Sequence, residues 1–232
     1  MKEQQILILG IGNVLWADEG FGVRCVEELN RQFTFPENVK LMDGGTQGLY
    51  LVPHVQLCDI LIIFDAIDYG LPCGQMKITE DGDVPMFMGA KKMSLHQTGF
   101  QEVLMTSDLI GDLPEKMILI GVQPVEIEDF GGSLRTEIKE QIQPSIEKAL
   151  RYLTDLGITY SERKEPLPAT EVLSPAQMAL NDYEAGRPSA EVACRTGDER
   201  VLTSKEMVFD PKAPILEDSM PVDVDYRGQY DK

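Results

Sequence analysis

The stretch LILGIGNVLWADEGFGVR, residues 7–24, places an apolar strand and a glycine pair before two acids and a helical pattern. A dinucleotide fingerprint requires a third glycine three residues after the second, where this chain has Leu15, and the Gly-Lys-Ser/Thr of a P-loop is absent. Asp18 and Glu19 stand where a phosphate would lie and would repel it, although they are favourable at a helix N-terminus. The glycine pair therefore predicts a tight turn rather than a phosphate site.

Apolar segments alternate with helical patterns over the first 160 residues. Strands are expected at 6–9, 39–42, 60–66, 76–79 and 117–122, and helices at 18–32, 48–57, 99–108 and 135–156. The third strand contains five consecutive apolar residues, which is typical of a strand that is covered on both faces. This alternation predicts an α/β fold, a three-layer sandwich with a mostly parallel twisted sheet of about five strands and helices on both faces.

Composition excludes several function classes. The formal net charge of −18 over 232 residues argues against nucleic acid as a partner, because acidic surfaces repel phosphate backbones. The four cysteines form neither a CxxC pair nor a Cys/His cluster, so no zinc site or disulfide framework is predicted. The N-terminus lacks the features of a signal peptide and the apolar runs are too short to span a membrane, so a cytoplasmic protein is expected.

The character of the chain changes near residue 160. Residues 161–232 contain seven of the fourteen prolines and lose the strong apolar periodicity. The sequence therefore predicts one α/β domain over residues 1–160 and a C-terminal extension over residues 161–232 that is poorly ordered or loosely docked.

Polar residues follow the first three strands. In doubly wound sheets, ligands bind beyond the carboxyl ends of the strands. Glu19 follows the first strand, Asp43-Gly44-Gly45-Thr46 follows the second, and Asp65 ends the third. An acid at the end of an apolar strand is costly unless it is paired or binds a metal.

The chain has two histidines. His54 lies in a predicted helix, where a surface or packing role is favoured, and His96 lies in a polar loop before a helix. With Glu19 and Asp65, His96 would complete a set of two carboxylates and one imidazole, which binds a borderline divalent metal. A merely exposed loop histidine and a simple acidic helix cap remain the alternatives. The absence of HExxH and GxSxG disfavours a zincin and a serine hydrolase.

Five segments identify a family resemblance when they are taken together. GIGNVLWADEGFGVR, MDGGTQGL, IIFDAIDYG, KKMSLHQTGF and ILIGVQP match, in this order, the hydrogenase maturation proteases. The chain resembles this family over roughly residues 4–158, and the wording of its motifs is similar to the branch that serves membrane-bound uptake hydrogenases. Members are endopeptidases that complete the large subunit of nickel–iron hydrogenases.

The resemblance implies a reaction and a site. The reaction is a single cut that removes a short C-terminal peptide from the large-subunit precursor after nickel insertion. Glu19, Asp65 and His96 would be both the metal ligands and the catalytic residues, and nickel would be shared with the substrate protein. Asp43, Gly44, Gly45 and Thr46 would shape the cleft and help to recognise the substrate.

Two questions stay open at this level. The family has been classed with aspartic peptidases, and the sequence does not separate metal-activated water from a carboxylate base as the driver of hydrolysis. A nickel-dependent chaperone that binds the immature large subunit without cutting it is the alternative function. A monomer is expected.

Overall fold

A computed structural model of the chain describes residues 4–88, 95–168, 173 and 178–187. Within these ranges, residues 86–88 and 95–98 are described by their backbone alone. Contacts divide the chain into a compact unit, Met1–Ala193, and a second unit, Cys194–Lys232. All described residues belong to the first unit.

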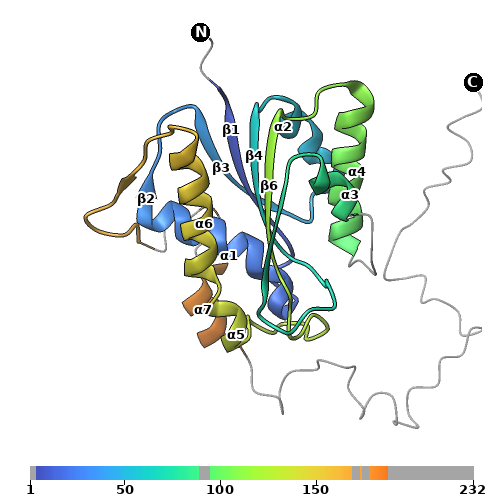
Figure 1. Cartoon of the computed structure of the whole chain (residues 1–232). Coiled ribbons are helices and arrows are strands. Elements are labelled where there is room, and N and C mark those ends of the chain that lie inside the picture. The colour runs from blue at the N-terminus through green and yellow to red at the C-terminus, as the bar shows by residue number, and fades with distance from the viewer. Residues whose placement is uncertain (1–3, 89–94, 169–172, 174–177, 188–232) are drawn as a thin grey trace, which may run out of the picture. The chain divides into compact units, whose positions relative to one another are not determined.

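A five-stranded sheet forms the centre of this unit (Figure 1). Its strands are β1 (Ile6–Ile11), β3 (Val39–Gly45), β4 (Ile60–Ala66), β5 (Met76–Glu80) and β6 (Lys116–Val122). They lie in the order β3-β1-β4-β6-β5, and all neighbours are parallel except β5, which pairs antiparallel with β6 at the edge. The predicted mostly parallel sheet is confirmed, and its four parallel strands end at one common edge, here called the carboxyl edge.

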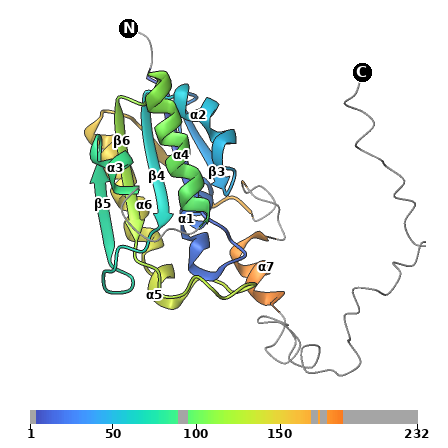
Figure 2. The same ribbon diagram turned by 90° about the vertical axis from the view of Figure 1, so that its right-hand side faces the viewer.

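Helices cover both faces of the sheet: they lie on either side of the strands in Figure 1, and Figure 2 looks onto one of the two faces. One face is covered by α1 (Phe21–Gln32), α5 (Thr136–Lys139) and α6 (Ile142–Asp155), and the other by the 3-10 helix η2 (Gly48–Leu51), α2 (Val52–Gln56), α3 (Asp83–Met88) and α4 (Leu95–Ile110). Alternate residues of a strand point to opposite faces, so β4 contributes Ile62 and Phe64 to one core and Leu61 and Ile63 to the other. The predicted three-layer sandwich is confirmed.

The segment 135–156 was predicted as one helix and forms two, α5 and α6. Pro144 lies in the first turn of α6. It has no N–H to donate to the carbonyl of Glu140, and its ring would clash with that carbonyl in a continuous helix. The chain therefore ends one helix and starts another, and the prediction of an unbroken helix is wrong.

Part of the predicted extension contacts the α/β layers. β2 (Phe33–Thr34) pairs antiparallel with β7 (Ser161–Glu162). The amide of Arg163 donates to the carbonyl of Gln32 at 2.7 Å. The short helix α7 (Leu180–Ala185) also belongs to this part of the chain. The domain boundary at residue 160 stays a prediction. No helix in the described ranges is long and apolar enough to cross a membrane.

Candidate active site at the carboxyl edge

Glu19 lies just beyond β1, in the 3-10 helix η1 (Ala17–Gly20), and its side chain is buried. Gly12 turns the chain between β1 and η1. Its φ of +133° lies in a region that side chains disfavour, and a Cβ at this position would lie 1.8 Å from the carbonyl oxygen of Glu19. The predicted tight turn is confirmed, and Gly12 permits the close backbone approach that places Glu19.

Glu19 and Asp65 are carried by elements that touch. Asp65 is fully buried near the end of β4. Gly22, three residues after Glu19, is wedged between two strands: a Cβ there would lie 2.1 Å from the carbonyl oxygen of Phe64 and 2.3 Å from that of Ile11. Because Asp65 directly follows Phe64, and η1 contacts β4, both acids lie in the same part of the carboxyl edge.

Asp18 has a structural role that the sequence did not reveal. It is fully buried, and three backbone amides donate to its carboxylate. Oδ2 accepts from Val125 at 2.9 Å and from Glu126 at 2.8 Å, and Oδ1 accepts from Arg135 at 2.6 Å. Asp18 therefore fixes η1 to the irregular segment 123–135, so burial and these bonds, more than the helix dipole, explain an acid at this position.

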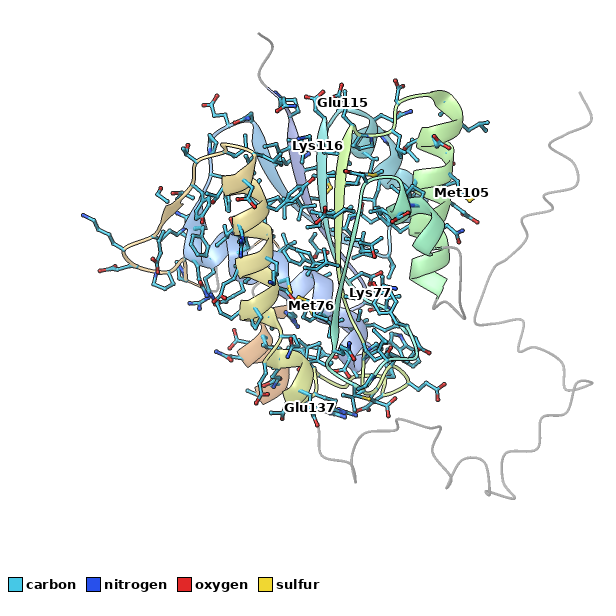
Figure 3. All side chains as sticks on the ribbon, in the orientation of Figure 1. Met76, Lys77, Met105, Glu115, Lys116 and Glu137 are labelled. Carbon is cyan, nitrogen blue, oxygen red and sulfur yellow. The ribbon has the colours of Figure 1, made fainter. Side chains whose placement is uncertain are left out.

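A tyrosine shares the surroundings of Asp65. Tyr69 lies over Gly121, the residue that pairs with Asp65 between β4 and β6, and a Cβ on Gly121 would lie 2.0 Å from the phenol oxygen. Burial and the negative charge of Asp65 raise the pKa of Tyr69, so the phenol stays protonated even in alkaline solution. Lys77 of β5, labelled in Figure 3, has its ammonium 5.2 Å from the ring centroid of Tyr69. Tyr69 belongs to the IIFDAIDYG motif, which is the sequence feature that could have identified it as a neighbour of Asp65.

Gln123 fixes the loop that follows β4. Its Oε1 accepts from the amides of Tyr69 at 2.7 Å and Leu71 at 3.1 Å, and its Nε2 donates to Oδ1 of Asp68 at 3.0 Å. Gln123 is buried. These bonds explain why a glutamine stands in the ILIGVQP motif. From the sequence, the motif supported the family resemblance but gave no role for Gln123.

β3 extends further than predicted: its last three residues are Asp43, Gly44 and Gly45, and Thr46 follows its end. A Cβ on Gly44 would lie 2.8 Å from the nearest side-chain atom of β1, and the carbonyl of Gly45 accepts from the amide of Gly12 at 3.0 Å. Asp43 is partly buried and Thr46 is exposed. The two glycines therefore let β3 pack closely beside the β1 turn. A role of residues 43–46 in substrate recognition stays a prediction.

His96 lies in the first turn of α4, so its prediction as a loop residue is wrong. The helix was predicted from apolar spacing, and its polar first turn gives no such signal. The side chain of His96 is outside the described residues. Three residues later, a Cβ on Gly99 would lie 3.4 Å from the Cα of Gly48 in η2, which packs the start of α4 near the end of β3. The backbone of His96 thus lies at the carboxyl edge.

The structure therefore describes the side chains of two members of the predicted metal triad, Glu19 and Asp65. Glu19 and Asp65 supply two carboxylates, and the imidazole would come from His96. Among the side chains that are described, no group of three or more His, Cys, Asp or Glu is arranged to hold a metal ion. The donor set is chemically suited to a borderline divalent metal, and its convergence stays a prediction.

An apolar surface lies on the segments that hold η1 in place. Leu15, Val125 and Phe130 are 38%, 42% and 47% exposed. The ring of Trp16 packs on Phe130 with centroids 5.2 Å apart, and the amide of Gly131 donates to the carbonyl of Leu15 at 2.7 Å. We refer to Leu15, Val125 and Phe130 as the apolar rim.

Comparisons with known proteins agree with this architecture. The family model described as "Hydrogenase maturation protease" matches residues 23–152. The chain is 58% identical over 203 residues to the hydrogenase expression/formation protein HupD of Thiocapsa roseopersicina, covering 88% of this chain and 92% of the relative. It is 55% identical to HoxM of Azotobacter vinelandii over 94% of this chain and all of the relative.

Among solved structures, the hydrogenase maturating endopeptidase HybD from Escherichia coli matches with a TM-score of 0.65 and 37% identity. It covers 68% of this chain and 98% of its own chain, so the HybD match leaves about a third of this chain without a counterpart, whereas the HoxM match extends into residues 161–232. The family match covers more than half of the chain, and several relatives exceed 50% identity. This chain therefore belongs to the hydrogenase maturation protease family.

Proposed function

We propose that this protein is the endopeptidase that removes the C-terminal peptide from the nickel-loaded precursor of a nickel–iron hydrogenase large subunit. One observation carries the proposal: in a chain of this family, the buried acids Glu19 and Asp65 are brought to one edge of the sheet by elements that touch. Burial of two carboxylates is costly, and a cation bound between them would offset part of that cost.

Nickel is proposed to arrive with the substrate. Glu19, Asp65 and His96 would supply oxygen and nitrogen ligands that suit Ni(II), and thiolates of the precursor can complete its coordination. A site of three protein ligands binds a metal weakly alone and more tightly when the substrate shares the ion. This arrangement would make the protease specific for the metal-loaded precursor.

Hydrolysis adds one water across the scissile C–N bond. The hydroxyl group bonds to the carbonyl carbon, and the proton passes to the leaving amine. We propose Asp65 or Glu19 as the general base that takes the proton from the attacking water. The metal can polarise the carbonyl or activate that water, so aspartic-type and metal-assisted routes share the same residues.

Substrate contacts are proposed for two neighbouring surfaces. The apolar rim, Leu15, Val125 and Phe130, is exposed and held by the segments that also hold η1, so a polypeptide entering the site would cover it. Residues 43–46 border the β1 turn and are proposed to guide the precursor. Monomeric state and cytoplasmic location stay predictions.

The test is the intact mass of a purified large-subunit precursor after incubation with the protein, with and without prior nickel loading. The proposal predicts that the nickel-loaded precursor loses its C-terminal peptide and that the nickel-free precursor does not. Equal cleavage of both would overturn nickel recognition. Complex formation without any change of mass would support the chaperone alternative and overturn the proposed protease activity.

A further inference from the structure

The described part of the C-terminal extension makes a network of contacts with the segment 123–135. After α7, shown in orange in Figures 1 and 2, Arg187 donates through Nη2 to both carboxylate oxygens of Asp129, at 2.8 and 3.0 Å. Arg135 donates to the same carboxylate at 2.9 Å. Burial opposes ionisation of Asp129, but the hydrogen bonds and charges of Arg135 and Arg187 outweigh it and lower the pKa of this acid.

α7 itself supplies a second contact. Oε1 of Glu184 accepts from the hydroxyl of Ser133 at 2.5 Å and forms an ion pair with Lys139 of α5. Glu184 and Arg187 therefore bind the segment 123–135 at two residues, Ser133 and Asp129. We call Glu184 and Arg187 the brace.

The same segment, residues 123–135, also binds the carboxylate of Asp18. Three of its amides, those of Val125, Glu126 and Arg135, donate to the buried carboxylate of Asp18, and the amide of Asp18 donates back to the carbonyl of Glu126 at 3.0 Å. Asp18 precedes Glu19 directly. A continuous series of hydrogen bonds thus connects the brace to the backbone that carries Glu19.

Residues 123–135 contain only isolated bridges and turns, without a helix or strand of their own. An irregular segment of this length loses considerable conformational entropy when it is ordered, so each external contact that fixes it shifts its population toward the ordered form. The brace supplies such contacts from residues beyond the family match, which ends at residue 152.

We propose that Glu184 and Arg187 are positioning residues for cleavage: by fixing residues 123–135, they hold Asp18 and hence Glu19 in the geometry that the reaction requires. The kinetic part of this inference rests on the proposed function. The structural part does not, because the order of the segment can be measured without substrate.

The main variant is Arg187→Ala in the full chain, with Arg187→Lys as the conservative form. Arg163→Ala is the matched control, since Arg163 belongs to the same extension and donates through Nε to the carbonyl of Asn30, away from the segment 123–135. Glu184→Gln removes the charge of the second contact at constant size and serves if Arg187→Ala does not fold.

Two quantities are measured for each variant: hydrogen exchange at the amides of Val125, Glu126 and Arg135, and kcat and KM for the nickel-loaded precursor. Arg187→Ala is expected to speed exchange at these amides and to lower kcat about tenfold with little change in KM, since displacement of a reacting group lowers the rate of the chemical step. Arg187→Lys should recover part of both, and Arg163→Ala should match the wild type.

Exchange and kcat in Arg187→Ala that equal those of Arg163→Ala would overturn the proposal. If the wild type cut no precursor at all, the proposed function would fail on its own, and exchange would still decide on the brace: faster exchange at the three amides supports it, and unchanged exchange overturns it.

Discussion

The loops that follow β1 and β4 are built alike, with one acid that organises the loop and one that is a candidate for chemistry. After β1, three amides donate to Asp18, and Glu19 is the candidate. After β4, the Gln123 side chain donates to Asp68, and Asp65 at the strand end is the candidate. The loops differ in how deeply the organising acid is placed: Asp18 is fully buried, whereas Asp68 is exposed.

The position of an acid in a motif therefore does not separate structural from reactive acids. Asp18 and Glu19 are adjacent, and both are buried, yet the three hydrogen bonds that the Asp18 carboxylate accepts come from a distant segment. Burial alone therefore does not mark a functional acid, and the partners of each oxygen must be known. Substitution of each acid can test this division of roles.

The two candidate acids should dominate activity. Asp65→Asn and Glu19→Gln keep side-chain size and remove a charge, so each should slow cleavage of the nickel-loaded precursor by about 10²–10⁴, the usual contribution of a general base. Asp68→Asn is the matched control and should retain most activity. Single-turnover rates followed by mass spectrometry measure this. Full activity of either candidate variant would end its assignment.

The two histidines offer a second contrast. His96→Ala is expected to abolish processing while the fold survives. His54→Ala should leave activity nearly unchanged, because His54 lies in α2 and is not one of the proposed site residues. Burial and the charge of Lys40 lower the pKa of its partly buried imidazole. Circular dichroism checks the fold of both variants, and the precursor assay checks activity. Normal processing by His96→Ala would remove His96 from the site.

Asp18 should matter first for stability. Asp18→Asn turns an NH₂ group toward backbone amides that now donate to a carboxylate, so we expect a loss of about 3 kcal/mol in the free energy of unfolding. Asp68→Asn, at an exposed position, should lose less than about 1 kcal/mol. Urea denaturation measures both. Similar losses in the two variants would contradict the difference drawn between the two loops.

Gly12 links the turn after β1 to the position of Glu19. In Gly12→Ala the added Cβ would lie 1.8 Å from the Glu19 carbonyl oxygen, at a φ of +133°. We expect a loss of about 1–3 kcal/mol in stability from strain, together with a lower kcat. Gly82→Ala is the control, because its Cβ would meet nothing within 4 Å. Equal behaviour of the two variants would show that the close approach at Gly12 is unimportant.

The smallest effect is expected at the apolar rim. Phe130→Ala should raise KM for the precursor several-fold with kcat unchanged, since truncating a half-exposed apolar contact removes about 1 kcal/mol of binding. Leu109→Ala on α4, where the side chain is 88% exposed, is the control. Steady-state kinetics measure both. A fall in kcat without a rise in KM would place Phe130 in the chemistry instead of in docking.

The central sheet was predictable because buried strands appear as continuous apolar runs. The strand predicted at 60–66 is β4, and its position puts Asp65 at the carboxyl edge. Five motifs, taken together and in order along the chain, pointed to the family. The weaker strand predicted at 76–79 was also found, but its antiparallel direction was not visible in the sequence.

Long-range contacts and local helix breaks account for what was missed. The partners of Asp18 lie more than 100 residues away in the chain, so no local pattern reveals them. The packing of Tyr69 on Gly121 depends on strand register. The helix break before Pro144 and the helical start at His96 were missed because apolar spacing shows the buried side of a helix and leaves its ends undefined.

The central claim is that Glu19, Asp65 and His96 converge on one metal ion. Crystals of the protein soaked in millimolar Ni²⁺, with diffraction recorded on both sides of the nickel absorption edge, test it most directly. One anomalous peak within bonding distance of all three side chains is expected. A nickel ion held by other residues, with Glu19 and Asp65 making no contact to it, would show that the three side chains do not form the metal site.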